Sequence, residues 1–243
     1  MELEGRVALV TGAARRVGRA IALRLAQEGC RVAVHYHRSA QAAQQTAAEC
    51  SRRGPESWPV AADLADLEAP RALVSAVTGH FGRLDLLINN AAVFERQSLE
   101  ELEADHWERT LRTNLTAPLL LAQAAGEALR AVGGRIVNLC DAASDRPWPD
   151  YLAYAVSKGA LETLTRALAR TFAPEVNVFG IAPGIAAWPE DYDQQTRRRL
   201  LQRVPLGRAG KPEEVADLLV ALLRQADYLT GAIVPLDGGR HLV

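Results

Sequence analysis

The chain has 243 residues, of which 49% are apolar, and its formal net charge is −1; this length and composition suit one α/β domain with a sizeable core. The balanced charge does not indicate nucleic acid or an anionic membrane as a partner, and no apolar run approaches the roughly 18 residues of a membrane span. We expect a cytoplasmic protein, because "MELEGRVALVTG" leaves no room for a signal peptide and the three cysteines are odd in number and widely spaced. The five histidines lack the spacing of a metal site, so we predict no metal.

Short apolar runs alternate along the chain with longer stretches rich in Ala and Leu. The expected strands are 6–12, 31–37, 57–64, 84–92, 135–141, 175–184 and 231–239. The expected helices are 16–29, 40–53, 69–81, 106–131, 152–173 and 212–225. Apolar strands between helices predict a single α/β domain over residues 1–243, with a doubly wound parallel sheet of about seven strands and helices on both faces.

One long stretch, 185–205 or "IAAWPEDYDQQTRRRLLQRVP", has no clear periodicity. It follows the sixth predicted strand and therefore overhangs the carboxyl edge of the sheet, where ligands bind in this architecture. We predict a substrate lid, with an ordinary surface insertion as the alternative.

The first strand runs into "TGAARRVG", Thr11–Gly18. Gly12 permits a tight turn, and Gly18 allows the next helix to pack closely, so the N–H groups at its start can receive a pyrophosphate. Arg16 stands where many such loops carry a further glycine. Its guanidinium is predicted to reach the pyrophosphate or a substrate edge, and the alternative is a solvated arginine at a helix start.

The second strand ends in "HYHRSA", His35–Ala40, without an acid. An acid at this position would bind a ribose 2′-hydroxyl and repel a 2′-phosphate. His37, Arg38 and Ser39 instead offer donors and positive charge, which predicts NADP(H) as the cofactor, with help from Arg15. The alternative is an ordinary basic loop.

Two further strand ends are assigned to the same cofactor. Asp63, after the third strand, is predicted to cap the adenine edge, or else to serve the start of the next helix. Asn90, Ala91 and Ala92 end the fourth strand, where small side chains let a dinucleotide lie close to the backbone.

"YAVSK" places the phenol of Tyr154 and the ammonium of Lys158 four residues apart, on one face of a predicted helix. A free tyrosine has a pKa of about 10, and a nearby cation favours the phenolate and lowers that pKa. Such a pair can exchange a proton with a substrate atom next to a hydride-transfer site.

In order, "TGAARRVG", "NNAA", Asn114 in "RTNLTAP", "YAVSK", "PG" at 183–184 and "DGG" at 237–239 resemble the short-chain dehydrogenases/reductases over essentially the whole chain. The resemblance implies a Rossmann-like fold, Tyr154 as acid/base, Lys158 on the nicotinamide ribose and Asn114 holding a water of the proton relay. It also implies a homotetramer or dimer, for which the helices at 106–131 and 152–173 are the expected contacts. The predicted cofactor contacts are Gly12, Arg15, Arg16, Val17, Gly18, His35, Tyr36, His37, Arg38, Ser39, Asp63, Leu64, Asn90, Ala91, Ala92, Tyr154, Lys158, Pro183, Gly184 and Ile185.

One position departs from the family pattern. The family usually has Ser thirteen residues before the catalytic Tyr, and this chain has Asp141, while Ser144 lies too near Tyr154 to replace that serine. An ionised Asp141 disfavours a neighbouring phenolate and keeps Tyr154 protonated, and a protonated Asp141 is itself an acid. Either state favours delivery of a proton to a basic C=N nitrogen, and the two groups are expected to titrate as a coupled pair.

Asp141, the arginine in the glycine loop and the "HYHRSA" strand end together resemble the pteridine reductases of this family. That resemblance implies NADPH-dependent reduction of dihydropterins or dihydrofolate, with Phe94 stacked on the pterin and Arg16, Asp141 and Tyr154 also facing the substrate. A carbonyl reductase, such as a 3-oxoacyl thioester reductase, is the alternative enzyme. A sensor that binds NADP without catalysis is the alternative outside the enzymes.

Overall fold

Seven parallel strands form one sheet in the order β3-β2-β1-β4-β5-β6-β7 in the computed structural model, which describes residues 1–144, 146–189 and 192–243. The strands are β1 Val7–Val10, β2 Arg31–Tyr36, β3 Ser57–Ala61, β4 Leu86–Asn89, β5 Arg135–Leu139, β6 Asn177–Pro183 and β7 Ile233–Leu236. The predicted doubly wound α/β fold is confirmed. Each predicted strand overran its observed counterpart at one or both ends, because the predicted ranges included the polar and glycine residues of the adjoining turns.

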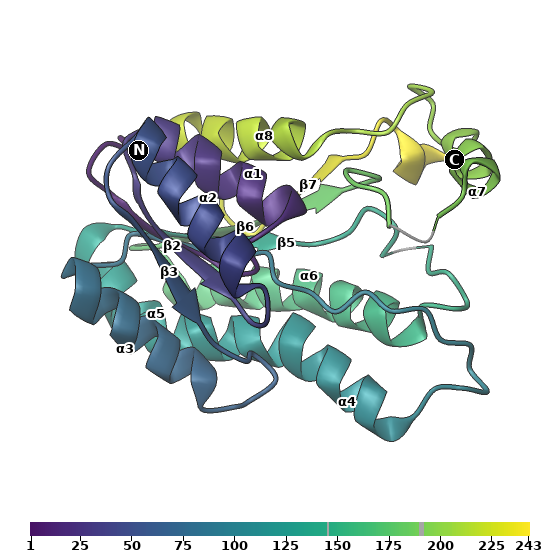
Figure 1. Cartoon of the computed structure of the whole chain (residues 1–243), viewed down its shortest axis with the longest axis horizontal. Helices are drawn as coiled ribbons and strands as arrows, with labels where there is room; N and C mark the ends of the chain where they lie inside the picture. Colours follow the sequence, from purple (N-terminus) through teal and green to yellow (C-terminus); the bar gives the residue numbers. More distant parts are fainter. Residues whose placement is uncertain (145, 190–191) are drawn as a thin grey trace.

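Helices cover both faces of the sheet (Figure 1). One face carries α1 Arg16–Gln27, α2 Ala40–Arg53 and α8 Pro212–Gln225; the other carries α3 Ala69–Phe81, α5 Ala117–Val132 and α6 Leu152–Phe172. Side chains of a strand point alternately to the two faces, so Ala8 and Val10 join one core while Val7 and Leu9 join the other. All four are fully buried, which explains why the run reads as continuously apolar.

The single long helix predicted over 106–131 is wrong. The chain instead forms α4 Ala104–Leu111, a π-helical turn η1 Arg112–Thr116 and then α5. Pro118 has no N–H to offer the carbonyl of Asn114 four residues earlier, so a regular α-helical hydrogen-bond ladder cannot continue through this point. The interruption holds Asn114, a predicted site residue.

The segment 185–205 was predicted to be irregular, but it contains the short helix α7 Gln194–Leu201; residues 190 and 191 of the predicted lid lie outside the described ranges. Asp193 caps this helix by accepting a hydrogen bond from the backbone N–H of Thr196 at 2.7 Å. Charged and polar residues dominate α7 and none of its residues is buried, so no apolar stripe marked it in the sequence. A further 3₁₀ turn, η2 Arg240–Leu242, follows β7.

The order of the strands reverses between β1 and β4, and the loops after these strands separate there to form a crevice at the carboxyl edge. The turn after β1, the residues after β4 and β5, and the start of α6 all meet at this edge (Figure 1). In the described ranges, no helix is long and apolar enough to cross a membrane.

Candidate active site

A cavity of about 710 Å³ opens at the carboxyl edge of the sheet. It is lined by every predicted site residue except Asn114, so residues from positions 12 to 185 of the chain converge on one space. This volume lies in the range of ligand sites in proteins. The sequence motifs were therefore correct about which positions share a cleft, and the contacts below show what each side chain does in it.

The turn after β1 needs its two glycines for different reasons. Gly12 has a φ of +62°, and a Cβ there would lie 2.9 Å from the Cα of Ala91. Gly18 has ordinary backbone angles, but a Cβ on it would lie 2.3 Å from the carbonyl oxygen of Gly12. The first glycine thus makes the turn and the second brings the start of α1 against it, which exposes the helix N-terminus to the cavity.

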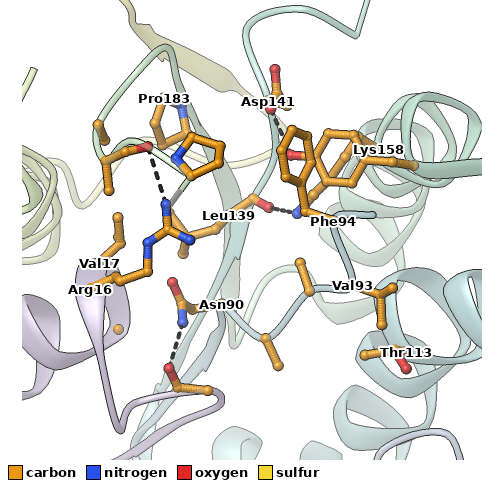
Figure 2. A pocket seen from close by; sticks show the side chains of 18 of the residues that line it. Arg16, Val17, Asn90, Val93, Phe94, Thr113, Leu139, Asp141, Lys158 and Pro183 are labelled. Atoms are coloured by element: carbon orange, nitrogen blue, oxygen red, sulfur yellow. Dashed lines mark hydrogen bonds between the residues drawn. The ribbon is translucent and has the colours of Figure 1, made fainter. Parts of the chain in front are cut away.

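Arg16 is, among the described residues, the non-glycine residue with a positive φ, at +54°. This left-handed conformation suits the glycine that many such loops carry, and it costs an L-residue about 1 kcal/mol. The Arg16 guanidinium donates a 3.2 Å hydrogen bond from Nη2 to the carbonyl of Ala187, in the predicted lid segment (Figure 2). The side chain therefore spans from the glycine loop to the segment that overhangs it, along the wall of the cavity.

His35, predicted as a direct cofactor contact, has its ring turned into the protein and is 2% exposed. Its Nδ1 accepts a hydrogen bond from the backbone N–H of Gly12 at 3.0 Å, and its Nε2 lies 3.1 Å from the carbonyl of Ala62. Both contacts are satisfied only by the neutral ring with its proton on Nε2. Burial lowers the pKa of His35 to about 4, so the neutral ring ties the β1 turn to the end of β3 at neutral pH. Its ring therefore positions the turn.

Of the other residues of the "HYHRSA" strand end, Tyr36 packs against the core, whereas His37 and Arg38 are exposed. Ser39 is the N-cap of α2, where its side chain makes no capping hydrogen bond. His37 has its Nε2 3.4 Å from Oδ2 of Asp63, a pair with both side chains about half exposed. The Asp63 carboxylate also accepts from the N–H of Ala65 at 3.0 Å, so it closes a turn as well as facing the cavity. Both roles predicted for Asp63, capping the adenine edge and serving the start of the next helix, are compatible with this position.

Asn90 fixes the far side of the crevice. Its Nδ2 donates to the carbonyls of Thr11 at 2.8 Å and Gly12 at 3.2 Å, while the Thr11 hydroxyl accepts from the backbone N–H groups of Asn90 and Ala91. These bonds clamp the ends of β1 and β4 together (Figure 2). The small side chains of Ala91 and Ala92 then line the cavity.

Tyr154 and Asp141 meet at the other end of the cavity. The Tyr154 hydroxyl donates a hydrogen bond of 2.6 Å to Oδ2 of Asp141, and Oδ1 of the same carboxylate accepts from the N–H of Ala143 at 2.7 Å. Ser144, the other hydroxyl in this loop, donates to the backbone carbonyl of Asp141 at 2.7 Å. Asp141 is therefore the partner of the tyrosine, and its orientation is fixed by the loop.

Burial, together with the negative charge and hydrogen bond of Asp141, raises the pKa of Tyr154 well above its usual value. Burial and the Asp141 carboxylate therefore outweigh the lowering of this pKa that was expected from Lys158. The Lys158 Nζ lies 5.7 Å from the centre of the Tyr154 ring and donates a 2.5 Å hydrogen bond to the carbonyl of Leu139 (Figure 2). Burial lowers the pKa of Lys158. The raised pKa of Tyr154 agrees in direction with the prediction that the Asp141 carboxylate keeps the phenol protonated.

Asn114 lies behind the cavity rather than in its lining, and it is 1% exposed. Its Nδ2 donates to the carbonyl of Val93 and the hydroxyl of Ser157, both at 3.0 Å, and its Oδ1 accepts from the N–H of Val93 at 2.7 Å. Three of the four hydrogen-bond positions of the amide are therefore occupied. Asn114 therefore braces the chain after β4 against α6. One lone pair of its Oδ1 is left for the relay water that the family resemblance implies.

A wall of aromatic side chains faces Tyr154. Of these residues, sequence analysis predicted only Phe94. The Phe94 ring stacks on Tyr151 with centroids 4.5 Å apart and meets the Tyr154 ring edge-on at 4.7 Å. The Tyr151 hydroxyl lies 2.9 Å from that of Tyr192, in the predicted lid, and Trp148 packs edge-on against Tyr151. Phe94 is 37% exposed, so it is not a core residue. Tyr151 was detectable from its position three residues before Tyr154, immediately before the helix that carries Tyr154.

Comparisons with known proteins agree with this geometry. Residues 12–241 match the family described as enoyl-(acyl carrier protein) reductase. The chain is 36% identical to a ketoacyl reductase of the granaticin polyketide synthase from Streptomyces violaceoruber, covering 99% of this chain and 98% of that protein. It is 31% identical to a 3-oxoacyl-acyl-carrier-protein reductase of Staphylococcus aureus, with 97% and 98% covered. A Burkholderia cenocepacia short-chain dehydrogenase solved with NADP superposes with a TM-score of 0.93 at 35% identity, covering 99% of each chain.

Proposed function

The chain belongs to the short-chain dehydrogenase/reductase family of oxidoreductases, and we propose that it reduces a C=N bond of dihydropterins or dihydrofolate with NADPH. The observation that carries the proposal is the 2.6 Å hydrogen bond from Tyr154 to the carboxylate of Asp141. A carboxylate at this position holds the phenol protonated and stabilises positive charge on a neighbouring basic nitrogen. A serine hydroxyl, usual at this position, suits a carbonyl oxygen instead.

The cavity fits a phosphorylated nicotinamide dinucleotide. At one end the turn after β1 and the start of α1 offer N–H groups to a pyrophosphate, and Arg38 with Ser39 offers a cation and a hydroxyl to a 2′-phosphate at the N-terminus of α2. At the other end Lys158 and Tyr154 face the place where the nicotinamide ribose is expected. The cofactor, when bound, supplies the hydride.

Tyr154 supplies the proton in this proposal. Its raised pKa keeps the hydroxyl protonated at neutral pH, so the group acts as an acid and favours reduction over oxidation. As the proton moves to the ring nitrogen, the Asp141 carboxylate stays within hydrogen-bond distance and offsets the positive charge that forms there. The Lys158 ammonium, 5.7 Å from the phenol ring, offsets the charge left on the phenolate oxygen.

The aromatic wall supports a flat heterocyclic substrate. Phe94 presents a partly exposed ring beside Tyr154, and Arg16 reaches over the cavity from the glycine loop. A flat ring between such groups gains stacking contacts and a guanidinium neighbour. We propose that residues 185–205 form the lid of this site, anchored by the contacts of Arg16 with Ala187 and of Tyr151 with Tyr192.

Carbonyl reduction is the second candidate, and the comparisons favour it. The two curated relatives reported above are named as reductases of ketoacyl or 3-oxoacyl groups, so their names agree with this candidate better than with pterin reduction. The Asp141 carboxylate is the feature that argues in the other direction.

A substrate panel separates the candidates. Oxidation of NADPH is followed with dihydrobiopterin, dihydrofolate and an acetoacetyl thioester at equal concentration. We expect turnover of the pterins and a kcat/KM at least tenfold lower for the thioester. Turnover of the thioester alone would reject the pterin proposal. Absence of turnover with all three, together with unchanged NADPH binding by Tyr154→Phe, would favour the sensor without catalysis.

A further inference from the structure

Arg240 brings a cation from the far end of the chain into the wall of the cavity. It begins the 3₁₀ turn η2 after β7, and its side chain is part of the cavity lining. Its guanidinium lies over the ring of Trp148, 5.0 Å from the centroid, and Trp148 lines the same cavity between β5 and α6. The stacking restricts where the guanidinium can point.

No hydrogen bond or ion pair joins the Arg240 guanidinium to another residue within the part of the chain that the structure describes. The two acids that raise the pKa of Arg240 have other partners: Asp237 accepts from the N–H groups of Gly239 and His241, and Asp141 binds Tyr154. Burial lowers the pKa of Arg240, a shift that Asp141 opposes and the neighbouring cation Arg203 reinforces. This cation is thus partly desolvated without a paired carboxylate, which is costly unless a ligand supplies one.

Three other cations that line the cavity have partners in the protein. Arg109 donates to the Glu95 carboxylate at 2.6 Å, Lys158 to the carbonyl of Leu139, and Arg16 to the carbonyl of Ala187. Arg240 differs from them in having no hydrogen-bond or ion-pair partner for its guanidinium among the described residues. Its planar fork matches a carboxylate with two parallel hydrogen bonds.

We propose that Arg240, stacked on Trp148, binds a carboxylate that the substrate carries apart from its reacting ring. The inference rests on the proposed function in taking this cavity as the site of reduction. A carboxylate site at Arg240 favours dihydrofolate among the proposed substrates, because dihydrofolate carries carboxylates on its side chain, whereas dihydrobiopterin carries none. Arg240 is therefore a specificity-determining residue for acidic substrates.

The test compares the two pterins in Arg240→Gln, which removes the charge and leaves a polar side chain, and in Arg240→Lys, which keeps the charge. We expect Arg240→Gln to lower kcat/KM for dihydrofolate about 10- to 100-fold, mainly through KM, the size of one charge-assisted contact. For dihydrobiopterin we expect a change within about twofold, and Arg240→Lys should restore part of the dihydrofolate activity. An equal effect on both pterins, or on neither, would overturn the assignment.

A second pair keeps this test separate from the pterin proposal. 4-Acetylbenzoate and its methyl ester are flat ketones that differ only in the charge remote from the reacting carbon. If the wild-type enzyme reduces no pterin but prefers the acid over the ester, and Arg240→Gln abolishes that preference, the carboxylate site holds while the pterin proposal fails. Absence of an Arg240-dependent preference in both pairs would reject the carboxylate site.

Discussion

The hydroxyl of Tyr154 is held 2.6 Å from the carboxylate of Asp141, thirteen residues earlier in the chain. The loop after β5 fixes the carboxylate through the N–H of Ala143, so the contact is built in before any substrate arrives. A buried phenol beside a carboxylate resists ionisation. The pair is therefore suited to giving a proton to a substrate atom.

The effect of Asp141 on Tyr154 can be measured directly. In Asp141→Asn the negative charge is lost while the shape is kept, so the pKa of Tyr154 should fall from its raised value towards that of a buried phenol without a charged neighbour. The alkaline loss of kcat in the reductive direction should accordingly move to lower pH. A profile of kcat against pH for both proteins tests this, with Tyr154→Phe as the inactive control. An alkaline limb that does not move would show that Asp141 leaves the tyrosine unaffected.

The left-handed backbone at Arg16 predicts a separation of stability from activity. Arg16→Gly and Arg16→Ala both lose the guanidinium contact with Ala187, but only glycine adopts a φ of +54° without strain. Arg16→Gly should therefore be more stable than Arg16→Ala by about 1 kcal/mol in urea unfolding. Both variants should lose pterin reduction to a similar degree, since both lack the guanidinium. Equal stability of the two would mean that this backbone angle carries no strain.

His35 predicts an acid-sensitive part of the stability. Its pKa is about 4 in the folded protein and 6.5 when unperturbed, so the unfolded chain binds more protons between these values and the folded state loses stability as pH falls from 6.5 to 4. The full loss from this one residue is about 3 kcal/mol. Unfolding free energies of wild type and His35→Gln at pH 7 and pH 4.5 test this. The difference between the two pH values should be smaller in the variant, and an identical difference would contradict the assigned role.

Cofactor choice is tested at Arg38, which is exposed at the end of β2 beside the N-terminus of α2. Arg38→Ala should weaken NADPH binding by about 1.5–3 kcal/mol, the value of one charge-assisted contact, and leave NADH binding nearly unchanged. Fluorescence titration with each cofactor gives both dissociation constants. Equal losses for the two cofactors would place Arg38 away from the 2′-phosphate.

Much of the fold and the grouping of the site were predictable from sequence because they follow from local signals. Apolar runs such as Val7–Val10 identify central strands, and the glycines at 12 and 18 identify the turn between strand and helix. Parallel strands place their carboxyl ends at one edge, so residues as distant as Gly12 and Tyr154 were expected to share a cleft, as they do.

What could not be predicted depends on contacts between distant segments. The inward turn of the His35 ring is set by Gly12 and Ala62, and the pKa of Tyr154 is set by burial that no spacing in "YAVSK" reveals. The break at Asn114 had a local signal in Pro118, which was outweighed by the long Ala- and Leu-rich pattern. Arg240 had no local signal, because only the folded chain brings it to Trp148.

The most direct test of the central claim is the substrate preference of Asp141→Ser, which restores the hydroxyl usual in the family. The ratio of kcat/KM for dihydrobiopterin to that for an acetoacetyl thioester is measured in the variant and the wild type. If the carboxylate serves a basic ring nitrogen, the ratio should fall at least about 100-fold, with pterin reduction lost and the thioester unaffected or improved. An unchanged ratio, with both activities altered together, would contradict the account.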